Sequence, residues 1–121
     1  MNTYKKGYIR FIIYKKRGER TFTGVCLDFG IVIENKDLEY VKKELETAAI
    51  GYLETVCKEK MDEALLNGRA NKKYYEIYYK ILESEREGSV VKREKLLDDV
   101  TEYDAHISSV NQLMPAGKCY A

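Results

Sequence analysis

The sequence has few of the residues and patterns that mark particular classes of protein. Its 121 residues include one proline and no tryptophan, and no apolar run approaches the length of about 18 residues that a transmembrane helix needs. The three cysteines form no Cys-x-x-Cys pair, so neither a disulfide framework nor a zinc site is expected. Cys26 and Cys57 are predicted to be small buried apolar residues. No glycine-rich phosphate loop of either common type is present.

Neither sign of charge is in excess over the whole chain, because 21 Lys and Arg stand against 20 Asp and Glu. A global field of the kind that attracts nucleic acid or membrane is therefore not expected. The basic groups are concentrated at the front, where residues 1–36 carry eight basic and three acidic side chains. Arg10 and the run Lys15, Lys16 and Arg17 interrupt the first apolar stretch, so it does not resemble a signal peptide. We expect a cytoplasmic protein that does not bind membranes.

The first third of the chain predicts an antiparallel sheet. Residues 8–14 are β-branched and aromatic, with apolar side chains alternating on one face. A polar turn containing Gly18 separates them from a second strand over residues 20–27, and residues 31–34 form a third. Strands this close in sequence pair as a meander.

A long amphipathic helix should follow the sheet. Asp37 is a good N-cap, and apolar residues recur at steps of three or four as far as Val56. The helix should run at least to Cys57 and cover one side of the meander. The same pattern allows it to continue through Met61 and Leu65 to Asn67-Gly68.

The second half predicts about two more helices. Residues 72–87 favour a helix, although residues 74–82 also satisfy the strand period. After Ser89, apolar residues step by three and four over nearly three heptads. These residues are Leu96, Val100, Tyr103, Ile107, Val110 and Met114.

The predicted fold class is therefore α+β: a three-stranded antiparallel meander covered by a long helix, followed by about two further helices. Residues 1–57 form the βββα domain, and residues 58–121 form a helical extension packed on that domain or on a second subunit. An apolar heptad seam left in water drives association, so we expect a homo-oligomer. The expected interface residues are Leu96, Val100, Tyr103, Ile107 and Val110, with Tyr74 and Tyr78 as anchors or as cover for the domain's own core.

A basic hairpin tip is the other candidate binding feature. Lys15, Lys16, Arg17 and Arg20 cluster around the first turn, near Tyr14. Such groups can contact phosphates, while the neighbouring aromatic ring can stack on bases. They also serve as a solvated turn that protects a sheet edge from pairing.

No residue pattern predicts catalysis, a metal site or a cofactor. The single histidine, His106, follows Asp104 by two positions, and on a helix these two side chains would lie on different faces. The carboxylates form no convergent pair of the kind that acid–base chemistry needs. We expect a protein that is not an enzyme.

Three segments carry a family resemblance. They are the bend at residues 26–33 (CLDFGIVI), the helix start at residues 35–41 (NKDLEYV) and the helix end at residues 48–53 (AAIGYL). In this order and spacing, residues 8–53 resemble the HicB-like antitoxin domain.

The resemblance implies a small α+β fold likened to a reduced RNase H fold that lacks its catalytic carboxylates. It also implies a protein that neutralises a small toxin-like protein by covering it and that forms dimers or tetramers. The alternative function is an oligomeric nucleic-acid-binding module that uses the basic hairpin.

Overall fold

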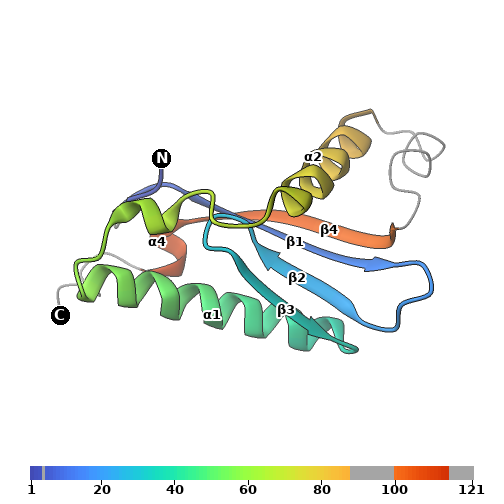
Figure 1. The fold of residues 1–121 in the computed structure, drawn as a ribbon, viewed down its shortest axis with the longest axis horizontal. Coiled ribbons are helices and arrows are strands. Elements are labelled where there is room, and N and C mark those ends of the chain that lie inside the picture. Colours follow the sequence, from blue (N-terminus) through green and yellow to red (C-terminus); the bar gives the residue numbers. More distant parts are fainter. Residues whose placement is uncertain (4, 88–99, 115–121) are drawn as a thin grey trace.

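The computed structural model describes residues 1–3, 5–87 and 100–114. The fold is α+β, with helices on both faces of one sheet (Figure 1). In chain order the elements are β1 (Tyr8–Lys16), β2 (Phe22–Cys26), β3 (Ile31–Asn35), α1 (Leu38–Lys58), the short 3-10 helix η1 (Glu63–Leu66), α2 (Lys72–Glu87), β4 (Val100–Ser109) and α4 (Val110–Leu113).

The predicted meander is confirmed. The sheet has the order β3-β2-β1-β4, and every neighbouring pair is antiparallel. The β1–β2 register places Ile13 opposite Gly24 and Phe11 opposite Cys26. The alternation of apolar residues in the sequence therefore identifies one packed face of β1 correctly, while Ile12 and Tyr14 on the opposite face are buried as well.

The helix predicted from the heptad spacing is wrong, because residues 100–109 form strand β4 along β1. This segment is rich in Thr, Ser, Asp and His, which are poor helix formers, and β1 offers it a full ladder of backbone partners. A register shift opposite Lys15 and Lys16 brings Val100 into the same apolar cluster as Tyr103 and Ala105. Residues three positions apart, such as Val100 and Tyr103, point to opposite faces of a regular strand, and the bulge between them allows both to join one cluster. Leu96 lies outside the described residues.

The long helix α1 covers one face of the sheet, as predicted. Asp37 is its N-cap, with the Asp37 carboxylate accepting a hydrogen bond from the backbone N–H of Glu39 at 3.0 Å. Its apolar side packs against Ile9, Phe11 and Ile13 in the first core.

The helix ends at Lys58, which confirms the prediction that it runs at least to Cys57. The extension to Asn67-Gly68 that the pattern also allowed does not occur. The backbone turns at Lys60, which has a φ of 51°, and a 3-10 helix follows. Cys57, in the last turn of α1, is 4% exposed and disulfide-bonded, while Cys26 is buried and free. The expectation of two buried cysteines is confirmed, but the expectation of no disulfide is wrong at Cys57.

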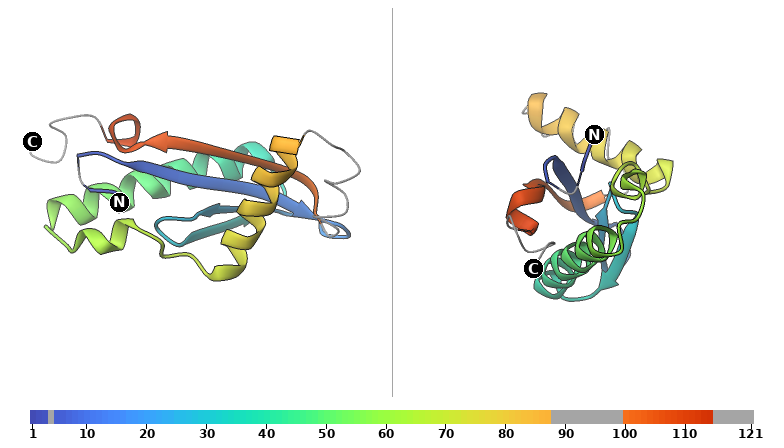
Figure 2. Two further views of the ribbon diagram at one scale, coloured as in Figure 1. Left: turned by 90° about the horizontal axis from the view of Figure 1, so that it is seen from above. Right: turned by 90° about the vertical axis from the view of Figure 1, so that its left-hand side faces the viewer.

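Helix α2 lies on the other face, which confirms the preference for a helix over residues 72–87. It crosses the strands obliquely (Figure 2) and buries Tyr78 and Ile81 against Ile12, Val25 and Leu27. This second core is smaller than the first, and α2 leaves part of its face of the sheet open.

Candidate functional site

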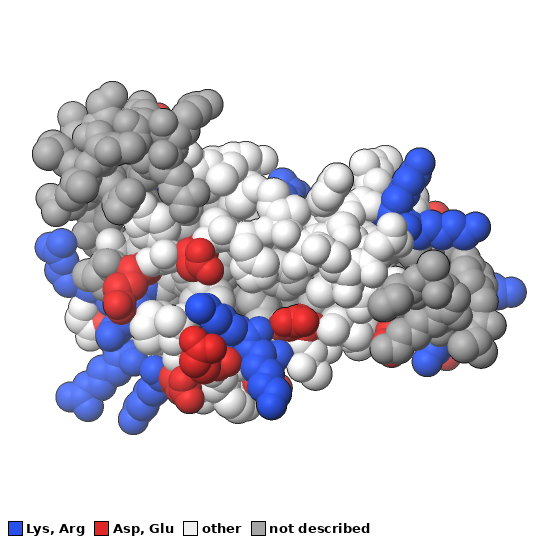
Figure 3. All heavy atoms as spheres, turned by 180° about the vertical axis from the view of Figure 1, so that it is seen from behind, with Lys and Arg blue, Asp and Glu red and all other residues white. Residues whose placement is uncertain are grey.

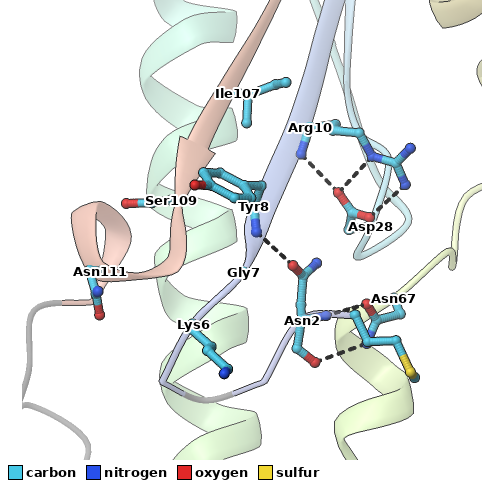
Figure 4. Close-up of a pocket in the computed structure, with 11 residues that line it drawn as sticks. Asn2, Lys6, Gly7, Tyr8, Arg10, Asp28, Asn67, Ile107, Ser109 and Asn111 are labelled. Atoms are coloured by element: carbon cyan, nitrogen blue, oxygen red, sulfur yellow. Dashed lines mark hydrogen bonds and ion pairs between the residues drawn. The ribbon is translucent and has the colours of Figure 1, made fainter.

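The open part of the second face forms a cavity where β1 begins and β4 ends (Figure 4). Tyr8 pairs with Ser109 and Arg10 with Ile107, so these four side chains lie on the same face of the sheet as α2, and this part of that face stays open. The cavity measures about 820 Å³. Its wall is formed by Met1, Asn2, Lys6, Gly7, Tyr8, Arg10, Asp28, Asn67, Ile107, Ser109 and Asn111.

Two large apolar side chains of this site are unusually exposed. Tyr8 is 68% exposed and Ile107 is 54% exposed, which places both among the large exposed apolar side chains of the described residues. They stand on neighbouring strands and together form an apolar surface beside Arg10. Exposed apolar groups that gather next to a polar rim are typical of binding sites.

The charged part of the site is an ion pair between β1 and the bend after β2. Arg10 donates from Nη2 to Oδ1 of Asp28 at 2.8 Å and from Nε to Oδ2 at 3.3 Å. The backbone N–H of Arg10 also donates to Oδ2, at 2.8 Å. Asp28 is 3% exposed, so its charge is almost fully removed from water and depends on Arg10 for compensation.

Helix α2 holds the same guanidinium from the other side. The Cζ atom of Arg10 lies 5.3 Å from the ring centroid of Tyr75 and 5.6 Å from that of Tyr78. The hydrogen bond to Asp28 is the main reason that the pKa of Arg10 is raised above its ordinary value, against the opposing effect of burial. Arg10 is therefore a fixed cation that stays charged.

Amide groups at residues 2 and 67 form the lower wall of the cavity. Asn2 accepts from the backbone N–H of Tyr8 at 2.7 Å and donates from Nδ2 to the carbonyl of Leu66 at 2.9 Å. Its own N–H donates to Oδ1 of Asn67 at 2.7 Å. Gly7, with a φ of 133°, allows the chain to turn here, and a Cβ at this position would collide with Oδ1 of Asn2. These bonds fasten the first residues to the loop before α2.

The arrangement is suited to binding. One oriented guanidinium lies beside an apolar surface, and amide groups surround them. Two of the five N–H donors of Arg10 are used by Asp28, so the group retains donors for a carboxylate or a peptide carbonyl. In the described ranges, no group of three or more His, Cys, Asp or Glu side chains is placed to hold a metal ion.

A second, smaller cavity lies on the α1 side of β4. It measures about 290 Å³ and is lined by Phe11, Ile13, Lys42, Leu45, Glu46, Asp104 and His106. The ring of His106 stacks on Phe11 with centroids 4.8 Å apart. Because residues 104 and 106 are in a strand, their side chains share a face, and the expectation that a helix would separate them is wrong.

The predicted interface residues are distributed over different environments. Val110 is fully buried in the first core, and Tyr78 is 5% exposed in the second. Tyr74, Val100 and Tyr103 are partly buried around the second core, and Ile107 alone of these described residues is exposed. They therefore do not form one continuous seam.

The basic hairpin tip is present as predicted at the β1–β2 turn. Arg17 and Arg20 are exposed, while Lys15 and Lys16 are half-buried. The Nζ atom of Lys15 lies 5.4 Å from the ring centroid of Phe22. Figure 3 shows basic side chains gathered at this end of the molecule with acidic ones among them.

Arg10, Asp28 and Asn2 are site residues that the sequence did not predict. A detectable signal existed for Arg10, since a charged residue inside a buried strand requires a partner. Asp28, at a bend 18 positions later, could be identified as that partner only once the β1–β2 register was known. Asn2 carried no signal.

The chain matches no known family model, and no curated protein or solved structure is significantly similar to it. Of the helices in the described parts of the chain, none is long and apolar enough to cross a membrane.

Proposed function

We propose that this chain is a non-enzymatic interaction protein of the HicB-like kind, which self-associates and binds a small protein partner in an antitoxin-like manner. The proposal rests on the resemblance over residues 8–53 and on the open cavity. The observation that carries it is the exposure of Tyr8 and Ile107 beside the fixed cation Arg10.

This surface fits a protein better than a small polar ligand. Tyr8 and Ile107 offer apolar area on a rigid sheet. Because the sheet is already ordered, this chain loses little conformational entropy when a partner binds. Arg10 can pair with a carboxylate or a backbone carbonyl at the rim of the contact. A partner segment with one apolar side chain and an adjacent acidic group matches both features.

The test uses the purified product of any small open reading frame found next to the gene. Isothermal titration calorimetry should show binding to the wild-type chain and a loss of at least tenfold in affinity for Tyr8→Ser with Ile107→Ser. Tyr79→Ser is the matched control, because Tyr79 is 56% exposed on α2 and is not among the residues that line the cavity. Absence of binding to the wild type, or an equal loss with the control, contradicts the proposal.

Nucleic-acid binding through the hairpin is a second proposal. It is favoured by the exposure of Arg17 and Arg20 in the turn that joins β1 and β2. Reversing the charges of Lys15, Lys16, Arg17 and Arg20 should abolish salt-sensitive binding of a labelled oligonucleotide. Binding that survives the four reversals contradicts this alternative.

A further inference from the structure

We propose that the partner protein contacts the cavity with an acidic segment, in which two carboxylate side chains flank one apolar side chain and one residue separates each of them from it. The inference rests on the proposed function, because it concerns the same site and specifies the segment that this site selects. The apolar side chain lies on Tyr8 and Ile107, and the carboxylates pair with Lys6 and Arg10.

The order of three side chains at the start of β1 carries the inference. Lys6, Tyr8 and Arg10 all line the cavity, so a cation, an exposed aromatic ring and a second cation follow one another at alternate positions of the chain (Figure 4). Two residues of extended chain advance at most about 7 Å. An extended partner segment that runs beside this stretch therefore brings its own alternate side chains opposite these three groups.

Both cations have donors to offer. Asp28 uses two of the five side-chain N–H donors of Arg10, so three remain. Lys6 is exposed, and its ammonium group makes no hydrogen bond or salt bridge within the described parts of the chain. Among the described residues that line the cavity, Asp28 is the only carboxylate, and it is 3% exposed. The accessible charge is therefore positive, and a complementary partner segment is negative.

The backbone around the cavity favours side-chain carboxylates over the carboxylate of a chain end. Chain ends are commonly captured by clusters of free backbone N–H groups. Here the N–H of Tyr8 donates to Oδ1 of Asn2 at 2.7 Å. The N–H of Arg10 donates to Oδ2 of Asp28 at 2.8 Å. Because these backbone donors are already used, negative charge in the cavity is left to the two side-chain cations.

The apolar part of the cavity favours a protein over a nucleic acid. Single-stranded nucleic acids stack successive bases on aromatic rings and follow a groove of many cations. Among the described residues that line the cavity, Tyr8 is the only aromatic one. Its apolar neighbour Ile107 has no flat surface on which a base can stack. An aliphatic side chain such as leucine can pack against both residues.

Short peptides test the segment. The probe is acetyl-Glu-Gly-Leu-Gly-Glu-amide, whose only charges are its two carboxylates, and NMR titration of the isotope-labelled chain measures its binding. The dissociation constant should rise about threefold to fivefold when either glutamate is replaced by glutamine, and further when both are replaced. The shifts should centre on the amides of Tyr8, Arg10 and Ile107. Equal binding of the peptide without carboxylates overturns the inference, and so does a probe that causes no shifts at millimolar concentration.

The variant Lys6→Gln assigns one carboxylate to its cation. In this variant one of the two single-glutamine peptides should bind as well as the probe, because the glutamate that it lacks has no cation left to meet. The other peptide should still lose affinity. Arg10 is left unchanged because it also compensates Asp28.

Lys43→Gln is the matched control, because Lys43 is exposed on α1 and does not line the cavity. In this control both single-glutamine peptides should lose affinity as they do with the wild type. Equal losses for both peptides in Lys6→Gln overturn the pairing of a carboxylate with Lys6.

The outcomes separate this inference from the proposed function. If the partner protein binds through Tyr8 and Ile107 while the peptides show no preference, the acidic segment is overturned and the proposed function stands. If the peptides show the preference and the partner protein does not bind, the selectivity of the cavity stands and the proposed function falls. A labelled oligonucleotide that displaces the probe, binds more tightly and loses affinity in Lys6→Gln overturns the acidic segment in favour of a nucleic acid.

Discussion

Arg10 and Asp28 are joined by three hydrogen bonds although they stand 18 positions apart, and they differ sharply in exposure. The side chain of Asp28 is 4% exposed, whereas that of Arg10 is 28% exposed and borders the cavity. The buried carboxylate thus orients a cation that remains accessible. One contact both stabilises the fold and prepares the binding surface.

Removing the cation should destabilise the fold. Arg10→Met leaves the buried charge of Asp28 without compensation, and we expect the free energy of unfolding to fall by about 2–4 kcal/mol in urea denaturation. The double variant Arg10→Met with Asp28→Asn carries no unpaired charge and should recover part of the loss. A loss below about 1 kcal/mol for Arg10→Met would show that water compensates Asp28 instead.

Two glycines make a matched pair for testing how closely α1 approaches the sheet. A Cβ at Gly24 would lie 2.5 Å from Cγ1 of Val41, whereas one at Gly51 meets nothing within 4 Å. Gly24→Ala should destabilise by about 1–3 kcal/mol because the helix must shift. Gly51→Ala, on the exposed side of α1, should stabilise by up to about 1 kcal/mol. Thermal unfolding of both variants measures the difference, and equal effects would contradict the packing described.

Alkaline pH should destabilise the chain through Tyr14. Burial is the main cause that raises the pKa of Tyr14 to about 12, compared with about 10 in an unfolded chain. Below pH 10 both states hold the proton and the stabilisation is complete. Between pH 10 and 12 the unfolded chain releases it first, so stability declines, by about 1–2 kcal/mol from this residue. Urea denaturation at pH 9 and pH 11 should show a smaller decline for Tyr14→Phe than for the wild type, and equal declines would assign the effect to other groups.

The cysteines should differ in reactivity. Cys26 is fully buried, and burial raises the pKa of its thiol to about 12, so iodoacetamide at pH 8 should not modify it in the folded chain. After denaturation without reductant, Cys26 should be alkylated and Cys57 should not, because Cys57 is disulfide-bonded. Peptide mass spectrometry distinguishes these states. Alkylation of Cys57 before reduction contradicts the disulfide.

The local elements could be predicted because their signals lie within a few residues. Alternation in β1, the Asp37 cap and the helical period of α1 each depend on neighbours in sequence, and all three predictions are confirmed. The helix over residues 72–87 was also predicted, although its tyrosines fit a strand as well. Its length decided in favour of the helix.

The sequence by itself determined the meander, the covering helix and the balance of charge, since propensity and periodicity act over short distances. Tertiary structure decided the rest. Residues 100–109 form a strand because they pair with the edge of β1 that β2 does not use. This long-range pairing decides their structure against the helix that the heptad spacing predicts. The same pairing placed Ile107 beside Arg10, and the β1–β2 register placed Asp28 against Arg10. The cavity forms where side chains from the start of the chain and β1, the bend at Asp28, Asn67 and the end of β4 come together, and their positions in the sequence do not indicate this.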